Sequence, residues 1–520
     1  MIKVTPGRRE ASSSHLTSRY SAPHSFLLGL FIVEFCAGGG RVRYDVAVVG
    51  GGISGLATAE MFARSGYSVA LVEKNEKLCS EASGAHHEWF HFGSLYSIFP
   101  SPQFLRTLVG GIDDILVYYR DFNGMNLRIQ GDGSLHTVTK KDAWLRHDTL
   151  DYAVATTKDP DFSLNTASSN REKLRRFVFK RGWDRVVGQF IARHDRFRSY
   201  DWRRGCASFY IGQQKWTDIL SAHAKMRPFR IDGANLNSDT HFHIDSYDRP
   251  MTAYNIIADL TRSFISHGGE IWNCKQLLSY KSTAADVELQ LVGDGLPQSL
   301  KANQVVICTG KGLQEFLPVG MKLKTVASPL LVAYPHVCES NVVRLIPFVE
   351  RTVNHLKHAT PDGSIYSLIG GGFFCDPDDE DAKERLRLQL LRRANEVFPR
   401  MAATSYREVY FSNKSELTSS LTKRNYLYRI EKIAPNVWVT VPGKFSLCFS
   451  LAVNTFRELR GHYPSTFVDY DFGMDVSKVV GVMRHKQLVA QYRGLPATVH
   501  GRPREVAAPN PVLLPLPRAA

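Results

Sequence analysis

Short apolar runs separated by stretches of helical periodicity organise the first part of the chain. Residues 46–49 form a β-branched apolar run, as in a strand buried on both faces, and residues 69–72 form a second one. Between them, residues 54–65 place leucine, alanine, methionine and phenylalanine at helical spacing, and Gly66 follows as a helix-terminating residue. This order predicts a strand–helix–strand unit with two parallel strands.

The same patterns return further along the chain and predict the remaining elements. Pro250 is expected to open a helix in the favoured first-turn position, residues 254–267 are amphipathic, and Gly268 and Gly269 end that helix. Residues 287–292 alternate as a half-buried strand. Further strands are predicted at residues 270–273, 277–280, 304–310, 332–335, 342–348, 364–369 and 436–441, and further helices at residues 103–122, 171–193, 381–397 and 448–460, the last one ending at Gly461.

The turn after the first apolar run contains glycines in the spacing of a dinucleotide-binding motif. Gly50 permits a tight turn, Gly52 lets the backbone approach a pyrophosphate, and Gly55 allows close packing of helix against strand. Ser54 lies in the first helical turn, whose free N–H groups and dipole favour phosphate. Glu73 follows Gly55 by 18 residues, near the position of a carboxylate that binds ribose hydroxyls. The motif predicts a dinucleotide site but does not by itself separate FAD from NAD.

Composition adds one local feature, a concentration of positive charge. The chain has 520 residues, enough for two or three domains, and a net charge of +15. Residues 171–206 hold twelve basic and four acidic side chains, so more than half of the excess lies in this segment. A solvated helical face is the simplest interpretation, with an anionic membrane surface or an anionic substrate as the alternative. Nucleic acid is disfavoured because no recognition motif accompanies the charge.

Cysteine spacing and the N-terminal region bear on the compartment. The eight cysteines are scattered, with no C-x-x-C pair and no Cys/His group at zinc spacing. They predict reduced thiols in a cytoplasmic enzyme without a metal site. Residues 1–43 are poor in acids and include an apolar run at 26–36 that is too short to span a membrane. We expect a disordered extension there, with a transit peptide as the alternative.

The loop after the second apolar run is rich in serine, glycine and histidine. It contains Ser83 and Gly84, then the pair His86-His87, then the pattern H-x-G-x-x-Y that begins at His91. With this loop the chain resembles the D-amino-acid-oxidase-like FAD-dependent oxidoreductases. That group includes sarcosine and glycine oxidases, L-2-hydroxyglutarate dehydrogenase and glycerol-3-phosphate dehydrogenase. The histidine pair is similar to the sarcosine oxidase version, and the H-x-G-x-x-Y pattern is similar to the hydroxyacid dehydrogenase version.

The resemblance implies that three segments hold one FAD. The second of them ends in the V-V-I-C-T-G run at residues 305–310, a module that an enzyme using NAD alone would not need. The third is the turn at 443–446, which looks like the G-K-x-T turn of glycerol-3-phosphate dehydrogenases. A helix N-terminus and Lys444 there would stabilise the negative charge of reduced flavin. The implied FAD-binding residues are Gly50, Gly52, Ser54, Gly55, Glu73, Lys74, Ser83, Gly84, Leu277, Thr309, Gly310, Gly443, Lys444, Phe445 and Ser446.

The resemblance also implies a substrate-domain sheet over the flavin, which supplies the groups that bind substrate. His355 and Tyr366 are the candidates retained as catalytic, because they lie on or beside predicted strands of this sheet. Other candidates for holding a substrate anion are Arg344, Arg351, His358 and Lys414. His91 is the candidate base, since histidine titrates near neutral pH. Covalent attachment of flavin to His91 is the less favoured alternative to a packing role.

These patterns and the resemblance predict an α/β protein with two domains. The first is a glutathione-reductase-type Rossmann FAD-binding domain formed by residues 44–110, 245–325 and 435–480. The second is an α+β substrate domain built on a mainly antiparallel sheet, formed by residues 111–244, which include an insertion, and 326–434. An N-terminal extension (1–43) and a Pro-rich tail (481–520) flank them.

The expected function is that of an FAD-dependent oxidoreductase. It would move a hydride from the CH–OH or CH–NH carbon of a small anionic substrate to flavin N5. An amine or amino-acid oxidase that produces hydrogen peroxide is the first alternative, and a protein that binds FAD without redox turnover is the second. The electron acceptor stays open among oxygen, a quinone and a carrier protein. We expect a cytoplasmic location, with peripheral membrane contact through residues 171–206 as the alternative.

Overall fold

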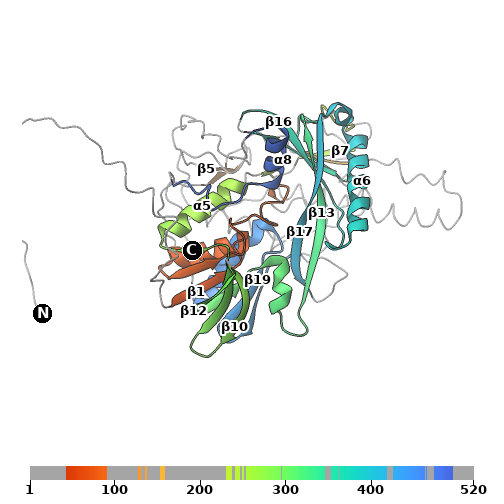
Figure 1. Cartoon of the computed structure of the whole chain (residues 1–520). Helices are drawn as coiled ribbons and strands as arrows, with labels where there is room; N and C mark the ends of the chain where they lie inside the picture. Colours follow the sequence, from red (N-terminus) through yellow and green to blue (C-terminus); the bar gives the residue numbers. More distant parts are fainter. Residues whose placement is uncertain are drawn as a thin grey trace, which may run out of the picture. The chain divides into compact units, whose positions relative to one another are not determined.

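The computed structural model divides the chain into the unit Met1–Val42 and the unit Arg43–Ala520. All described residues belong to the second unit: 43–90, 127–129, 135–137, 153–157, 230–236, 241–245, 249–250, 253–293, 295–345, 353–360, 362–418, 426–462, 464 and 474–495. Two sheets of this unit carry the architecture (Figure 1). The predicted N-terminal extension, the predicted helices at 103–122 and 171–193, and the basic segment lie outside the described residues.

The first sheet is a parallel core extended by antiparallel strands. The parallel order is β19–β12–β1–β2–β9. On the β12 side, β11 and β10 continue as an antiparallel meander, and β18 pairs antiparallel with β19. The strands are β1 (Tyr44–Val49), β2 (Val69–Val72), β9 (Glu270–Trp272), β10 (Gln276–Ser282), β11 (Val287–Gly293), β12 (Leu296–Ile307), β18 (Arg429–Ala434) and β19 (Val437–Val441).

Two apolar layers bury both faces of the parallel strands, which explains their continuous apolar runs. Val46 and Val48 of β1 pack against three helices, α1 (Ile53–Arg64), α5 (Ala253–Ser266) and α7 (Cys448–Arg460). Ala47 and Val49 face the opposite cluster, built largely from the meander. Helix α7 ends at Gly461 in the left-handed conformation, as the sequence predicted.

The second sheet has the order β17–β13–β16–β15–β14–β6–β7, and every neighbouring pair except β14–β6 is antiparallel. Helix α6 (Glu380–Val397) lies along it and closes a separate apolar cluster (Figure 1). Asp379 caps this helix by accepting a hydrogen bond from Ala382 N–H. The strands are β6 (Ala153–Thr157), β7 (His241–Asp245), β13 (Lys322–Tyr334), β14 (Val342–Leu345), β15 (Val353–Ala359), β16 (Ile365–Gly371) and β17 (Tyr406–Thr418). The predicted fold class is confirmed.

The remaining elements are short. Two pairs of strands stand apart from the sheets, β3 (Trp89–Phe90) with β8 (Arg249–Pro250), and β4 (Leu127–Ile129) with β5 (Leu135–Thr137). Three 3₁₀ turns, η5 (Gly310–Phe316), η7 (Pro399–Ala403) and η8 (Phe445–Leu447), follow strand or helix ends. Within the described residues, the helices are too short or too polar to cross a bilayer.

The structure corrects three predicted boundaries. Pro250 belongs to β8, and α5 begins at Ala253, whose N–H donates 2.8 Å to Glu88 Oε1, so a distant carboxylate caps the helix in place of a proline turn. Strand β18 joins the first sheet, so that sheet resumes before residue 435. Residues 481–495 are not a tail, because helix α8 (Arg484–Tyr492) buries its His485 and Val489 side chains. The Pro-rich residues after 495 lie outside the described part.

Candidate active site

A cavity of about 1180 Å³ opens at the carboxyl ends of the parallel strands. Its wall includes Val49, Val72 and Val441, the last residues of β1, β2 and β19, and Cys308, which directly follows β12. Ligands of parallel α/β sheets bind at this edge. The volume exceeds the roughly 300–1,000 Å³ of most small-molecule pockets, so it accommodates a large ligand.

The glycine turn forms one wall of the cavity, and its three glycines have different structural reasons. At Gly50, with φ +104°, a Cβ would stand 2.7 Å from Cys308 O, and at Gly55 a Cβ would stand 1.9 Å from Gly50 O. Both glycines are therefore required by the packing of the protein itself. At Gly52, a Cβ would meet only Ser83 Oγ, at 3.4 Å, which is an ordinary contact. The backbone at Gly52 therefore faces cavity space that protein atoms leave open.

Helix α1 directs its N-terminus at that space. Gly52 is its N-cap and supplies no side-chain cap, so the first-turn N–H groups without intrahelical partners are available to a ligand. Ile53 N–H is the exception, because it donates 3.0 Å to Ser83 Oγ and so fixes the loop behind β2. The arrangement is an anion site of the kind formed by helix N-termini.

Glu73 is held at the cavity wall by backbone donors. Its Oε2 accepts from Gly51 N–H at 2.6 Å, and its Oε1 accepts from Asn75 N–H at 2.9 Å and from Asn75 Nδ2 at 2.7 Å. Burial raises the pKa of Glu73, and these hydrogen bonds oppose that increase. The carboxylate is thereby fixed between the glycine turn and the loop after β2, the position expected of the ribose ligand.

A small polar cluster connects the three predicted cofactor segments below the cavity. Cys308 Sγ lies 3.0 Å from Thr440 Oγ1, and Thr440 Oγ1 lies 3.4 Å from Ser54 Oγ. All three residues line the cavity. Segments that are hundreds of residues apart in the chain therefore form one wall.

The structure brings most of the predicted cofactor residues to this cavity. Those on its wall are Gly50, Gly52, Ser54, Glu73, Lys74, Ser83, Leu277, Thr309, Gly310, Gly443, Lys444, Phe445 and Ser446. Gly55 packs beneath the turn, and Gly84 packs against Cys79 O, where a Cβ would come within 2.5 Å. The third segment differs in detail from the predicted helix start, because η8 comes between the Gly443 turn and α7.

Four buried polar atoms on the cavity wall have no hydrogen-bond partner among the described residues. They are His86 Nε2, Thr309 Oγ1, Tyr410 OH and Ser412 Oγ. Because buried polar atoms of native proteins are nearly always satisfied, these atoms indicate a bound ligand. Thr309 was among the predicted FAD-binding residues, whereas the other three were not.

His86 presents a hydrogen-bond donor to the cavity. Its Nδ1 accepts from Glu88 N–H at 2.8 Å, so the neutral ring carries its proton on Nε2. Burial, with smaller contributions from His485 and Lys414, lowers the pKa of His86 to about 4 against the opposing effect of Glu88. The ring packs on Phe445 with a centroid distance of 4.5 Å. The histidine pair drew attention in the sequence, but its geometry could not be derived there.

Strand β17 of the second sheet supplies the opposite wall. Tyr410, Ser412 and Lys414 alternate along the strand, so their side chains share one face, and all three line the cavity. Burial raises the pKa of Tyr410 well above its ordinary value, so its hydroxyl stays protonated. Of these three residues, only Lys414 was a candidate from the sequence.

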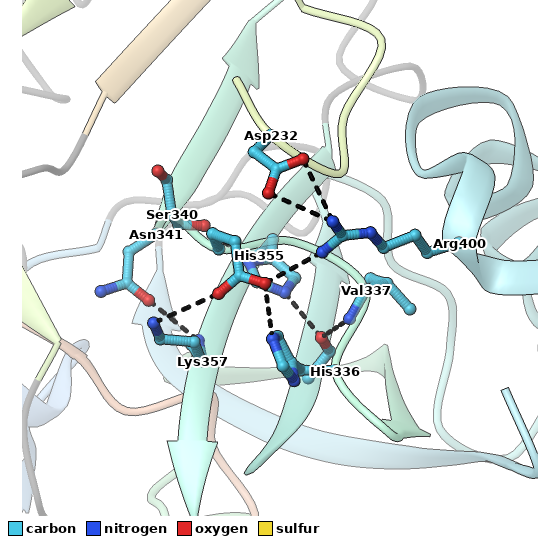
Figure 2. A network of polar contacts seen from close by, with 10 residues as sticks. Asp232, His336, Val337, Ser340, Asn341, His355, Lys357 and Arg400 are labelled. Carbon is cyan, nitrogen blue, oxygen red and sulfur yellow. Dashed lines mark hydrogen bonds and ion pairs between the residues drawn. The ribbon is translucent and has the colours of Figure 1, made fainter. Parts of the chain in front are cut away.

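The residues predicted to be catalytic are placed elsewhere. Neither His355 nor Tyr366 is on the cavity wall. His355 Nδ1 donates 2.9 Å to Ser340 O, and its Nε2 lies 2.7 Å from Ser367 Oγ, next to the ion pairs that Glu339 makes with Arg400 and Lys357 (Figure 2). Tyr366 OH lies 2.7 Å from His485 Nδ1. His91 is outside the described residues, and its role as base stays a prediction.

Two histidines with lowered pKa values make the stability of the ligand-free protein depend on pH. Burial lowers the pKa of His355 to about 3 and that of His86 to about 4, against about 6.5 in the unfolded chain. Between these values the unfolded state binds more protons, so stability falls as the pH drops from about 6.5. At pH 5 each histidine costs about 2 kcal/mol. Urea unfolding at pH 7 and pH 5 measures the loss, and His355→Asn should remove about half of it. A variant with the wild-type pH dependence would contradict the assignment.

The fold and the cavity define a class, that of two-domain oxidoreductases that bind a dinucleotide at the carboxyl edge of a Rossmann sheet. Residues 45–441 match the family model described as FAD dependent oxidoreductase, so the chain belongs to this family. It is an FAD-dependent enzyme, and the resemblance seen in its sequence is confirmed. No curated protein matches the chain.

Solved structures share the fold at low sequence identity. The amino acid oxidase NikD of nikkomycin biosynthesis is 12% identical, with a TM-score of 0.53 over 85% of this chain and 98% of that one. L-α-glycerophosphate oxidase from Mycoplasma pneumoniae, solved with FAD bound, is 12% identical, with a TM-score of 0.50 over 85% and 99%. Glycine oxidase from Geobacillus kaustophilus is 14% identical, with a TM-score of 0.49 over 86% and 100%.

The residues present fit FAD. The open backbone at Gly52 and the N-terminus of α1 suit the pyrophosphate, and Glu73 suits a ribose. Lys444, whose Nζ lies 4.7 Å from the centre of the Tyr426 ring, carries a positive charge at the third segment. The unpaired Thr309 Oγ1 adds a polar atom to the same wall.

Proposed function

We propose that the protein oxidises a small anionic molecule at a carbon that bears a hydroxyl group, with hydride transfer to N5 of bound FAD. The observation that carries this proposal is the polar wall of β17, which faces the same cavity as the glycine turn. Bound FAD supplies the two-electron acceptor. The residues of the chain bind the substrate and orient its reacting carbon.

The groups on and beside β17 suit an anion with several oxygen atoms. The protonated hydroxyls of Tyr410 and Ser412 and the Nε2–H of His86 all donate, and Lys414 adds a full positive charge. Charge-assisted hydrogen bonds of this kind are about twice as strong as neutral ones. A carboxylate or phosphate bound there satisfies the His86, Tyr410 and Ser412 donors, which have no hydrogen-bond partner among the described residues.

Carboxylates lie on other parts of the cavity wall. Among the described lining residues these are Glu73, Glu81 and Glu315, none of which belongs to β17 or to the turn at 443–446. An ammonium group next to Lys414 would therefore meet no carboxylate among the described lining residues of this part of the wall. This favours oxidation of a C–O bond, and an amino-acid oxidase that produces hydrogen peroxide is the alternative. The proton acceptor predicted from the sequence is His91.

Anaerobic bleaching of the flavin tests the proposal. Short hydroxyacids and polyol phosphates form one panel, and amino acids and secondary amines of the same size form the matched panel. We expect a member of the first panel to reduce the flavin. Reduction only by the second panel, with hydrogen peroxide on admission of oxygen, would establish the alternative. If dithionite reduces the flavin but no compound of either panel reduces it, the result would count against the proposed oxidation of a small anion. The reduced enzyme then reports which acceptor reoxidises it: oxygen, a quinone or a carrier protein.

A further inference from the structure

Three buried side chains outside the cavity wall converge from distant parts of the chain. Glu88 lies in the loop after β2, His358 on β15 and His485 on α8. Each side chain is at most 1% exposed. The cluster therefore joins the loop of the first domain to the sheet of the second and to the helix near the C-terminal end.

The ligand atoms are spaced as around a metal ion. Glu88 Oε2 lies 3.3 Å from His358 Nδ1 and 3.2 Å from His485 Nε2, and the three atoms lie within 4.8 Å of one another. Ligand atoms 2.0–2.2 Å from a tetrahedral zinc ion are roughly 3.3–3.6 Å apart. Glu88 Oε2 thus faces two imidazole nitrogens from two different elements at once, as a carboxylate does that shares a metal ion with them.

The outer contacts of His485 and Glu88 match those of a metal site. Metal-ligating histidines usually hydrogen-bond through the other ring nitrogen, and ligating carboxylates are hydrogen-bonded in turn. His485 Nδ1 lies 2.7 Å from Tyr366 OH, and Glu88 Oε1 accepts from Ala253 N–H at 2.8 Å. Glu88 also has φ +55°, an uncommon conformation for a residue with a side chain.

We propose that Glu88, His358 and His485 form a site for a divalent transition metal, with zinc as the ion that two imidazoles and a carboxylate suit best. In this site His358 binds through Nδ1 and His485 through Nε2, and Tyr366 is a positioning residue that orients His485. The ion fixes the loop that carries His86 to β15 and α8. The site would be missed in the sequence because its ligands are 270 and 127 residues apart, without any of the local spacings that mark zinc motifs.

Metal analysis of the FAD-loaded protein tests this site. After equilibration with excess zinc chloride and desalting, we expect about one zinc per chain, and zinc K-edge absorption should show nitrogen and oxygen neighbours. A wild-type protein that retains no zinc overturns the proposal. Sulfur neighbours overturn it too, since they would place the ion on a thiol such as the exposed Cys274.

Substitutions place the ion. His358→Gln and His485→Gln should reduce bound zinc to background, while His336→Gln, which removes a histidine paired with Glu339 at 2.9 Å, should leave it unchanged. Tyr366→Phe should weaken zinc affinity about 10–100-fold while the zinc neighbours stay the same. Full zinc content in both ligand variants contradicts the site. The zinc K-edge spectrum of the wild type identifies the ligand atoms by itself. The site can therefore be tested even if a variant fails to fold.

Discussion

Gly52→Asp yields folded protein that retains essentially no FAD. The structure leaves open space at the Gly52 backbone, and the added carboxylate enters it at the N-terminus of α1, where the pyrophosphate is expected. Repulsion between like charges and the lost helix-terminus contacts together cost several kcal/mol, so we expect affinity for FAD to fall by about 100-fold or more. Flavin absorbance per chain and titration of the apoprotein with FAD measure the change.

Two matched substitutions separate charge from size. Asp and Asn are both good N-caps, so Gly52→Asn keeps the stability of α1 but removes the charge. Gly52→Ala adds one methyl group, which the protein itself tolerates because it meets only Ser83 Oγ at 3.4 Å. The loss of FAD affinity should be smallest for Gly52→Ala, larger for Gly52→Asn and largest for Gly52→Asp. The three apoproteins should have similar unfolding midpoints. Wild-type flavin content in the Asp variant would refute the placement of the pyrophosphate.

The cofactor half of the cavity was predictable because its determinants are local in sequence. Gly50 and Gly52 lie in the turn after β1 and Gly55 lies in the first turn of α1, and close packing requires Gly50 and Gly55 in any chain with this geometry. Parallel strands buried on both faces read as continuous apolar runs, which is why β1, β2 and the end of β12 were found. Here local pattern and tertiary environment agree.

The substrate half was not predictable, because its determinants depend on register and on long-range pairing. Tyr410 and Ser412 reach the cavity only because β17 pairs with β13 along 13 residues, which brings the strand to the same cavity as the glycine turn. His355 was expected on or beside a predicted strand of the second sheet, but it lies on β15, which contributes no residue to the cavity wall, and Ser340 and Ser367 bind its two ring nitrogens. Placement in the right sheet did not establish the right strand.

Helix α8 illustrates a second limit. Its segment has low hydrophobicity and no capping side chain, and it precedes a Pro-rich stretch, so the sequence favoured a tail. The helix is nevertheless fixed by a few buried contacts, of which that of His485 with Tyr366 is polar and specific. A segment held by such tertiary contacts has little periodic signal of its own.

Lys414→Met weakens substrate binding with little effect on FAD. If Lys414 pairs with the substrate anion in the cavity, truncation costs about 2–4 kcal/mol, or roughly 30–1,000-fold in the dissociation constant measured by anaerobic flavin reduction. The limiting rate of reduction should change far less, because the charge is present in the ground state as well as the transition state. Lys432→Met on the exposed strand β18 is the control, since Lys432 is not on the cavity wall.

The specificity of that loss distinguishes charge recognition from general damage to the site. A neutral ester or amide of the substrate lacks the anion, so it should bind the wild type poorly and Lys414→Met about equally. The substitution would therefore remove the preference for the anionic substrate over its neutral ester or amide, while the remaining affinity for both stays similar. An equal loss for charged and neutral substrates would contradict anion recognition by Lys414. Loss of flavin from the variant would instead indicate that Lys414 binds the cofactor. Lys414 lies close enough to His86 to lower the pKa of that ring, so its charge acts on this part of the cavity in either case.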